Sequence, residues 1–261
     1  MPDHYTYAST EVLVNRRGYT DPALWKAAER RVVHTHMADL TVHPIPGSFD
    51  LRHLQAIHAA LVDGFYDWGG RLRDTDTGPG GTGIAHCRPE YIPGEATRIF
   101  TALAGMDYLR GRTADQFSKG LAWVWGETTV LHPFRDINTR SQFVFFNQLA
   151  ADADWVIDWN RIDPRVFAHA RTVAIFRDEA GIDALLHPAL IRLEEVTRRE
   201  DLRQQIDGTN EAFFARHSSR SPEQLDTRLQ SALERRRRNL PEADDFGRHG
   251  PSGLEPPGRT L

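Results

Sequence analysis

The sequence predicts an all-α protein. Apolar residues recur three and four positions apart through several long stretches, which is the spacing of one face of a helix. Few windows alternate between apolar and polar residues, and no regular spacing of strands is visible. Residues 70–92 break the helical pattern because they are rich in Gly, Asp and Thr and include Pro79 and Pro89. We expect a loop or a short hairpin with a glycine-rich tip there.

Two helices are expected before that loop. The first begins with Asp21 as its N-cap and Pro22 at the first helical position. The second begins near Ser48 or Asp50, since either side chain is suited to capping. Its apolar face carries Leu51, Leu54, Ile57, Leu61 and Phe65. His58 lies on the same face, and we interpret it as a packed histidine rather than a ligand.

Further helices are expected after the loop. Thr113 and Gln116 have the spacing of a capping box, and they predict the start of a helix that ends near Leu131. Apolar spacing predicts additional helices over residues 94–111, 139–149, 163–176, 187–206 and 221–240. We divide the chain into a helical domain with an N-terminal extension at 1–207, a C-terminal helical extension at 208–240 and a disordered tail at 241–261. The tail is rich in Pro and Gly and poor in apolar residues, which is typical of disorder.

The composition is ordinary for a soluble globular protein and excludes several classes. The 261 residues carry a formal net charge of -4, which gives no overall attraction to nucleic acid or anionic membrane. The single cysteine, Cys87, excludes an intramolecular disulfide and is interpreted as an incidental thiol. No apolar run approaches the roughly 20 residues that span a bilayer, and the N-terminal stretch lacks the features of a signal peptide. We expect a cytoplasmic protein with neither a membrane nor a direct nucleic-acid partner.

The stretch LHPFRDINTRSQFVFF at residues 131–146 carries the candidate chemistry. It places four functional side chains within nine positions: His132, Asp136, Asn138 and Arg140. The preceding helix ends near Leu131, and the next is expected to begin near Thr139 with Gln142 as a capping-box partner. Free N–H groups at a helix start form a ready anion site. An arginine in the first turn is unfavourable for the helix dipole unless an anion is bound there.

These residue types suit the transfer of a phosphorus group to a hydroxyl. Asp136 is a candidate ligand for Mg²⁺, which takes one or two carboxylates together with phosphate oxygens. The side-chain amide of Asn138 is a candidate donor to a phosphate, and Phe134 a candidate anchor for the loop. The unperturbed pKa of a histidine side chain lies near neutrality, so His132 is a candidate base for an incoming hydroxyl. The alternative from the residues alone is that these are capping and surface groups between two helices.

At these residues the sequence resembles the Fic family, whose signature reads His-x-Phe-x-(Asp/Glu)-Gly-Asn-Gly-Arg, often followed by x-x-Arg. The stretch HPFRDINTR keeps His132, Phe134, Asp136, Asn138 and Arg140. Upstream, YTDPALWKAAERR and HPIPGSFDLRHLQAIHAALVDGFYDWGGRLR are similar to the N-terminal half of bacterial Fic proteins of the cell-filamentation type. RPEYI resembles the end of the flap, the hairpin that docks their target. The resemblance covers about residues 5–190.

The resemblance implies a Fic fold, which is an all-α helical bundle with a small β-hairpin flap. It implies a protein adenylyltransferase that transfers AMP from ATP to a Ser, Thr or Tyr hydroxyl of a target protein. By that likeness His132 is the base and Asp136 carries Mg²⁺. The nucleotide phosphates would be held by Ile137, Asn138, Thr139 and Arg140. The flap residues that would align the target backbone by strand addition are Gly83, Ile84, Ala85 and His86.

Three positions depart from the signature. Ile137 and Thr139 replace its two glycines, and Phe143 stands at the final arginine position. Glycine serves where backbone takes φ > 0 or approaches a ligand closely, so Ile137 has either an ordinary φ or a strained backbone. Phe143 removes a cation that would help to hold the terminal phosphate. We expect weaker or altered nucleotide handling.

The sequence contains no match to the inhibitory helix that many Fic proteins carry. Many Fic proteins carry (Ser/Thr)-x-x-x-Glu-(Gly/Asn), whose glutamate pairs with the arginine that Phe143 replaces. The nearest stretch here is Ser219 with Glu223, and it fails because Gln224 follows. The resemblance therefore suggests a separate small antitoxin as a partner, although the usual ion pair could not form.

Three functions remain open from the sequence. The first is protein adenylylation. The second keeps the fold but transfers another nucleotide or phosphate. The third is a binding protein that keeps the groove and has lost turnover. The four retained polar residues of the motif favour activity, whereas the losses at Ile137, Thr139 and Phe143 favour altered or absent activity.

Overall fold

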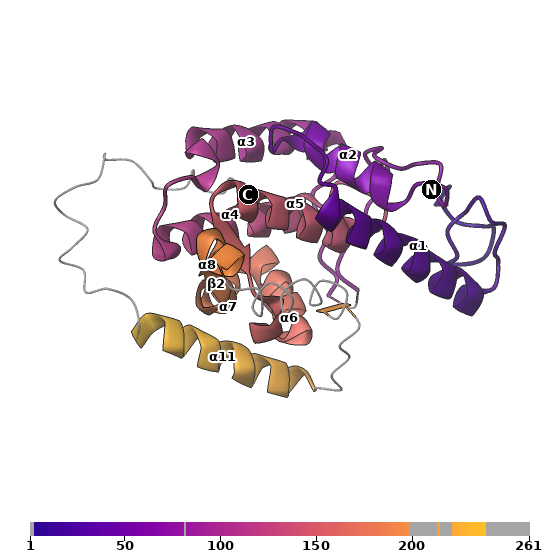
Figure 1. Cartoon of the computed structure of the whole chain (residues 1–261). Coiled ribbons are helices and arrows are strands. Elements are labelled where there is room, and N and C mark those ends of the chain that lie inside the picture. The colour runs from indigo at the N-terminus through magenta and orange to yellow at the C-terminus, as the bar shows by residue number, and fades with distance from the viewer. Residues whose placement is uncertain (1–2, 81, 199–212, 215–220, 239–261) are drawn as a thin grey trace.

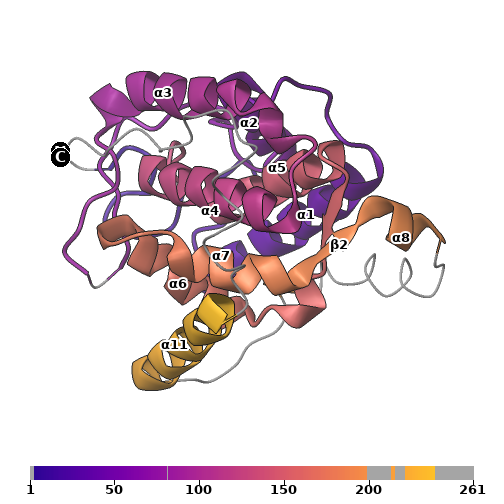
Figure 2. The same cartoon turned by 90° about the vertical axis from the view of Figure 1, so that its left-hand side faces the viewer.

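Helices α4 (Ala114–Leu131) and α5 (Asn138–Asp152) lie at the centre of the molecule. The structure is a computed structural model, and it describes residues 3–80, 82–198, 213–214 and 221–238. One side of the central pair is covered by α1 (Pro22–Val42), α2 (Leu51–Leu61) and α3 (Ile92–Gly105). The other side carries α6 (Pro164–Phe176), α7 (Ala180–Leu186) and α11 (Pro222–Arg238), as Figures 1 and 2 show. The central pair is thus enclosed between two groups of helices.

Short elements complete the described fold. They are the 3-10 turns Pro89–Tyr91, Asp107–Leu109, Trp159–Arg161 and His187–Ala189, the strands β1 (Trp155–Ile157) and β2 (Leu190–Arg192), and helix α8 (Leu193–Arg198). The all-α prediction is confirmed, with one small two-stranded antiparallel sheet in the described residues.

The predicted helix starts are confirmed where local sequence determines them. Asp21 accepts hydrogen bonds from the N–H groups of Ala23 and Leu24, and Asp50 accepts one from His53. Thr113 and Gln116 form the reciprocal capping box at the start of α4. Each cap satisfies backbone donors that the first turn leaves without a helical partner.

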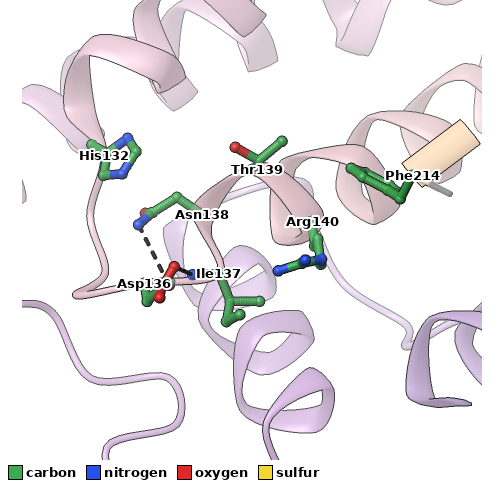
Figure 3. A pocket seen from close by; sticks show the side chains of 7 residues that line it. All are labelled: His132, Asp136, Ile137, Asn138, Thr139, Arg140 and Phe214. Carbon is green, nitrogen blue, oxygen red and sulfur yellow. Dashed lines mark hydrogen bonds between the residues drawn. The ribbon is translucent and has the colours of Figure 1, made fainter. Parts of the chain in front are cut away.

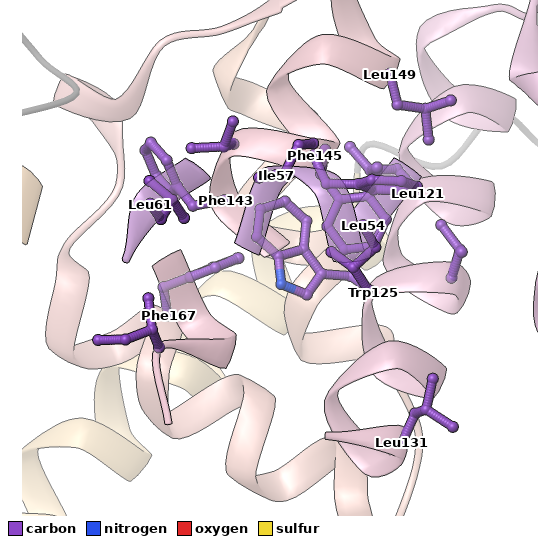
Figure 4. Close-up of a cluster of buried hydrophobic side chains, with 14 of the residues drawn as sticks. Leu54, Ile57, Leu61, Leu121, Trp125, Leu131, Phe143, Phe145, Leu149 and Phe167 are labelled. Carbon is purple, nitrogen blue, oxygen red and sulfur yellow. The ribbon is translucent and has the colours of Figure 1, made fainter. Parts of the chain in front are cut away.

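The core forms where the apolar faces of these helices meet. The cluster in Figure 4 joins α2, α4, α5 and α6 through Leu54, Ile57, Leu61, Leu121, Trp125, Leu131, Phe143, Phe145, Leu149 and Phe167. Trp125 packs edge-on against Phe167, with ring centroids 5.1 Å apart. Burial of such side chains is worth about 1.5–3 kcal/mol each before conformational entropy is subtracted. The core thus fixes the ends of α4 and α5 relative to each other.

The strand β2 corrects the helix expected over 187–206. Leu190, Ile191 and Arg192 pair with Ile157, Val156 and Trp155, and the helix α8 begins only at Leu193. The pairing partner lies more than thirty positions away, so helical spacing in the local sequence could not reveal it. Residues 199–206 of that expected helix lie outside the described residues.

The expected hairpin flap is also corrected. Residues 70–80 and 82–88 form a loop without paired strands in the part that is described. The backbone N–H of His86 bonds the carbonyl of Thr77 at 2.9 Å, which closes the loop at its base. The N–H groups of Arg73 and Cys87 instead bond the carbonyls of Pro133 and Val130. These donors reach the last turn of α4 and the connection after it rather than a neighbouring strand, so no ladder forms.

Helix α11 confirms the helix expected over 221–240, although one face of it is buried. Arg236 is 6% exposed and donates hydrogen bonds to the carboxylates of Asp183 and Asp115. The tail expected at 241–261, and Ser219 of the compared inhibitory stretch, lie outside the described residues. No helix in the described ranges combines the length and apolar character needed to cross a bilayer.

Candidate functional site

The connection between α4 and α5 contains two residues with left-handed backbone. His132 ends α4 with φ +42°, and Ile137 precedes α5 with φ +61°. Of the two alternatives for Ile137, the structure shows the strained one. A residue in this region costs about 1–3 kcal/mol, and its surroundings must hold it there. The connection is therefore a constrained turn and not a free loop.

Asn138 holds this turn closed. Its Oδ1 accepts a hydrogen bond from the N–H of Phe134 at 2.9 Å, and its Nδ2 donates to the carbonyl of Phe134 at 2.8 Å. The side chain is 2% exposed. The amide that was expected to donate to a phosphate is thus engaged by the loop. Phe134 is fully buried, as expected for the anchor of the loop.

The first turn of α5 is left without a capping side chain. The expected capping box is wrong, because α5 begins at Asn138 and Ile137 provides no capping oxygen. Gln142 Nε2 donates instead to the carbonyl of Thr128 at 3.0 Å. The first helical bond is donated by Ser141, so the N–H groups of the three preceding residues have no helical acceptor. This helix start keeps the donors that bind an anion.

His58 supports the turn from α2, and its interpretation as a packed histidine is confirmed. Its Nδ1 accepts a hydrogen bond from the N–H of Gly70 at 2.8 Å, so Nε2 carries the proton and faces the carbonyl of Asp136 at 3.3 Å. The ring stacks on Phe134 with centroids 3.8 Å apart. Complete burial lowers the pKa of His58 to about 3, so it is neutral at physiological pH.

Arg73 ties the loop at residues 70–88 to the end of α4. Its side chain is 2% exposed, and it donates to the carbonyls of His132 (2.7 Å), Thr75 (2.8 Å), Cys87 and Leu131 (3.4 Å). Carbonyls at the C-terminus of a helix carry partial negative charge and suit a guanidinium. Arg73 therefore fixes the backbone at His132.

A cavity of about 240 Å³ lies at the start of α5. Figure 3 shows its lining residues, which are His132, Asp136, Ile137, Asn138, Thr139, Arg140 and Phe214. The structure thus brings together all six motif residues that the sequence singled out for the base, the metal and the phosphates. The side chain of Ile137 points away from His132 in this view (Figure 3). Gly83, Ile84 and Ala85 do not line the cavity and are exposed.

His132 is held neutral beside a second imidazole. The ring of His86 stacks on it, with centroids 3.7 Å apart and planes 5° apart. Burial lowers the pKa of His132 well below its usual 6.5, and the charges of His86, Arg171 and Arg73 act in the same direction, against a hydrogen bond to the Thr129 carbonyl. A neutral imidazole is the form that can accept a proton.

Asp136 presents a carboxylate that suits a cation. Its Oδ1 accepts the N–H of Ile137 at 2.6 Å, and its Oδ2 lies 3.6 Å from Lys26 Nζ of α1. Lys26 also bonds the buried carboxylate of Glu29 at 3.1 Å. The Asp136 side chain is 35% exposed, so it is open to a hydrated ion. Within the described residues no group of three His, Cys, Asp or Glu side chains is arranged to hold a metal by itself. One carboxylate together with water and phosphate oxygens is a usual coordination shell for Mg²⁺.

Arg140 extends from the first turn of α5. Its Nε is buried and has no hydrogen-bond partner among the described residues, and its guanidinium lies 5.8 Å from the ring of Phe214. A buried donor without an acceptor is unfavourable. An anion at the helix start would remove that cost.

Comparisons with known proteins agree with this geometry. The family model described as the Fic/DOC family matches residues 48–150. The probable protein adenylyltransferase y4lH of Sinorhizobium fredii is 32% identical over 185 residues, which cover 70% of this chain and 94% of y4lH. The chain belongs to the Fic/DOC family. The probable protein adenylyltransferase Fic of Salmonella typhimurium is 30% identical over 193 residues, which are 74% of this chain and 94% of that protein.

Other Fic proteins are longer than this chain or share its fold at lower identity. The protein adenylyltransferase VbhT of Bartonella schoenbuchensis is 32% identical over 205 residues, or 78% of this chain, but the chain spans only 42% of VbhT. The BepC protein of Bartonella tribocorum, solved with bound AMPPNP, has a TM-score of 0.67 at 23% identity and covers 72% of this chain and 96% of its own. A Fic domain of Bartonella quintana with bound ADP has a TM-score of 0.69 at 22% identity. The match covers 75% of this chain and 98% of that domain. These two likenesses show the Fic fold.

The structure adds residues around the Fic motif that the sequence did not single out. Arg73, Lys26 and Arg171 reach the motif from three different segments, and nothing in their local sequence marks them. Phe143 was predicted to remove a cation, and its ring is 2% exposed against Trp159, with centroids 4.4 Å apart. In this Fic protein the position of the final arginine is therefore part of the core.

Proposed function

We propose that the chain is a protein adenylyltransferase, which transfers AMP from ATP to a Ser, Thr or Tyr hydroxyl of a target protein. The hydroxyl oxygen bonds the α-phosphorus, the bond between that phosphorus and the oxygen of the β-phosphate breaks, and pyrophosphate leaves. The observation that carries the proposal is a neutral, half-buried His132 in one cavity with an uncapped helix start. The relatives named as protein adenylyltransferases support the same reaction.

Each motif residue has a proposed role. His132 takes the proton of the hydroxyl on its imidazole as general base. The N–H groups of Asn138, Thr139 and Arg140 hold phosphate oxygens, helped by the dipole of α5. The Arg140 guanidinium adds charge-assisted hydrogen bonds to the same anion. The Asn138 side chain keeps the turn in shape, and Ile137 forms part of the wall.

Asp136 is the proposed Mg²⁺ ligand. The ion, when bound, neutralises charge on phosphate oxygens and orients them. Lys26 Nζ lies 3.6 Å from the same carboxylate, so the carboxylate already attracts one positive charge. Asp136→Asn should remove the Mg²⁺ dependence of nucleotide affinity, as measured by calorimetry with and without the ion. Asp39→Asn, an exposed acidic residue of α1 outside the cavity, is the matched control.

The exposed residues Gly83, Ile84 and Ala85 are the proposed docking site for the target, with His86 at their inner end. Their backbone is not part of a ladder, so an extended target segment can pair with it. His86 would then lie between the docked segment and His132. A separate antitoxin is a proposed regulator. Because Phe143 is buried, the inhibitory helix of the antitoxin would have to act by filling the cavity rather than by pairing with an arginine.

A second candidate is a Fic protein with another nucleotide substrate or with binding alone. The left-handed Ile137 and the buried Phe143 favour it, because both change the phosphate site. Incubation of the protein and cell lysate with Mg²⁺ and each labelled ATP, GTP, CTP and UTP separates the candidates. We expect label from ATP on protein, and none with His132→Ala. Label from another nucleotide supports the second candidate, and the absence of all labelling with retained nucleotide affinity supports binding alone.

A further inference from the structure

Arg171 of α6 lies beneath the first turn of α5. Its Nη1 donates to the hydroxyl of Thr139 at 3.2 Å, and its Nη2 donates to Gln142 Oε1 at 3.1 Å. Its Nε faces the hydroxyl of Thr129 at the other side of the α4–α5 connection, at 3.4 Å. The side chain is 7% exposed and does not line the cavity. One buried guanidinium thus contacts both helices that frame the site.

All three contacts of Arg171 are neutral. Burial lowers the pKa of Arg171 to about 10, so it stays charged at physiological pH, and no carboxylate in the described parts of the chain bonds it. A buried charge without a counter-charge is expensive. Arg236 is buried to a similar degree but has two carboxylate partners, Asp183 and Asp115. Among the described residues the charge of Arg171 therefore has no acidic partner, and an anion bound in the cavity would balance it.

The position of Arg171 separates it from the other buried arginine of the site. Arg73 lies at the C-terminal carbonyls of α4, where the helix supplies partial negative charge. Arg171 lies at the N-terminus of α5, where the helix supplies partial positive charge of the same sign as its own. Without an anion these two positive charges repel each other. With an anion in the cavity, both attract it.

We propose that Arg171 is a positioning residue whose unbalanced buried charge, acting through Thr139, favours a polyphosphate at the start of α5. It supplies from behind the helix the positive charge that the buried ring of Phe143 cannot supply. The inference rests on the proposed function, because it assigns a role toward the nucleotide. The same charge also acts on His132, together with His86 and Arg73, and favours the neutral ring.

The test measures the affinity for Mg-AMP-PNP by calorimetry in the full chain. Arg171→Met keeps much of the side-chain volume without its charge, and we expect its Kd to rise about tenfold or more, since charges act strongly in a poorly solvated site. Arg171→Lys keeps the charge and should recover most of the affinity. Unchanged affinity in Arg171→Met, or an equal loss in both variants, overturns the proposal.

A second pair of variants covers the outcome that Arg171→Met does not fold. Gln142→Glu places a carboxylate against Arg171 at nearly constant shape. Gln142→Met removes the hydrogen bonds of Gln142 to Arg171 and Thr128 without adding charge. We expect Gln142→Glu to weaken nucleotide binding several-fold more than Gln142→Met. Equal effects of the two substitutions overturn the proposal.

One measurement needs no nucleotide and separates this inference from the proposed function. In the ring titration of His132 by NMR, assigned from the signal lost in His132→Gln, the pKa should rise in Arg171→Met and stay low in Arg171→Lys. A purely structural role of Arg171 would not distinguish these variants. If the wild type binds no nucleotide, the proposed function fails, even where the titration shows the charge acting on His132. An unchanged titration in Arg171→Met overturns the electrostatic basis of the inference.

Discussion

His86 covers the face of His132, with the two ring centroids 3.7 Å apart and the planes nearly parallel. The cover comes from the loop at residues 70–88, and His86 Nδ1 is held 3.0 Å from the hydroxyl of Thr77. Burial also lowers the pKa of His86 to about 4. Both rings are therefore neutral at physiological pH, and one face of the proposed base is covered by a residue that belongs to the proposed docking segment.

The first prediction concerns the acid limb of activity. A general base works only when it is unprotonated, so the lowered pKa of His132 should keep kcat/KM high at pH values below 6.5. His86→Ala admits water to His132 and should move the acid limb upward, toward 6.5. His86→Phe keeps a stacked ring and should leave the limb near its wild-type position. Identical limbs in the wild type and His86→Ala would contradict a covering role.

Acid should destabilise the fold from a higher pH than carboxylate titration alone would produce. His53, His58, His86, His132 and His187 have folded pKa values below the unfolded value of about 6.5, chiefly because they are shielded from water. Below pH 6.5 the unfolded chain binds protons at these rings that the folded protein does not bind. The free energy of unfolding is therefore unaffected by these groups above pH 6.5 and decreases as pH falls below it. Each group contributes up to about 1.4 kcal/mol per pH unit.

Urea denaturation at pH 7, 6 and 5 measures this loss. The free energy of unfolding should decline across the series, and more gently in His86→Phe, which lacks one of these histidines. The lowered pKa values of Asp3 and Asp115 change stability only as pH falls below about 3.8, so their contribution is constant across this range. A flat profile between pH 7 and 5 would show that the pKa values of these histidines are not lowered in the folded protein.

Ile137 allows a test of backbone strain. Both Ile137→Ala and Ile137→Gly lose the buried side chain, which is 2% exposed. Only glycine is at ease at φ +61°, so Ile137→Gly should be the more stable of the two by about 1 kcal/mol. Thermal or urea unfolding measures the difference. At Ala168, an exposed position within α6, glycine should instead be less stable than alanine by about 1 kcal/mol. If the alanine variant were more stable than the glycine variant at both positions, the left-handed turn at Ile137 would be ruled out.

Restoring the arginine of the family signature should not improve the protein. Phe143 packs against Trp159, Phe213 and Phe214, with ring centroids 4.4, 5.4 and 4.9 Å apart. Phe143→Arg would bury a charge without a carboxylate partner and should destabilise by at least about 3 kcal/mol. Phe143→Leu keeps the site apolar and should cost about 1 kcal/mol. A stable Phe143→Arg variant with raised nucleotide affinity would mean that this position faces the phosphates.

Local sequence predicted the parts of the fold that local interactions determine. The capping box of Thr113 and Gln116 was predicted correctly, since both partners lie in one turn. Strand β2 was missed because its partner β1 is remote in sequence, and helical spacing in the segment was misleading. The motif residues gather as expected, yet the sequence could not show that the amide of Asn138 is spent on Phe134. Arg171 was missed because a charged residue in a helix is ordinarily solvent-exposed, and only packing reveals that this one is not.

The guanidinium of Arg73 has a consequence beyond the rigidity of one turn. Its hydrogen bonds join the carbonyl of Cys87, next to His86, to the carbonyl of His132, so the stem of the proposed docking segment and the proposed base move as a single body. The tip at residues 82–85 is outside that body. Substitutions at the tip can therefore change which target protein the proposed docking segment accepts. The geometry of the proposed reaction centre at His132 would not change with them.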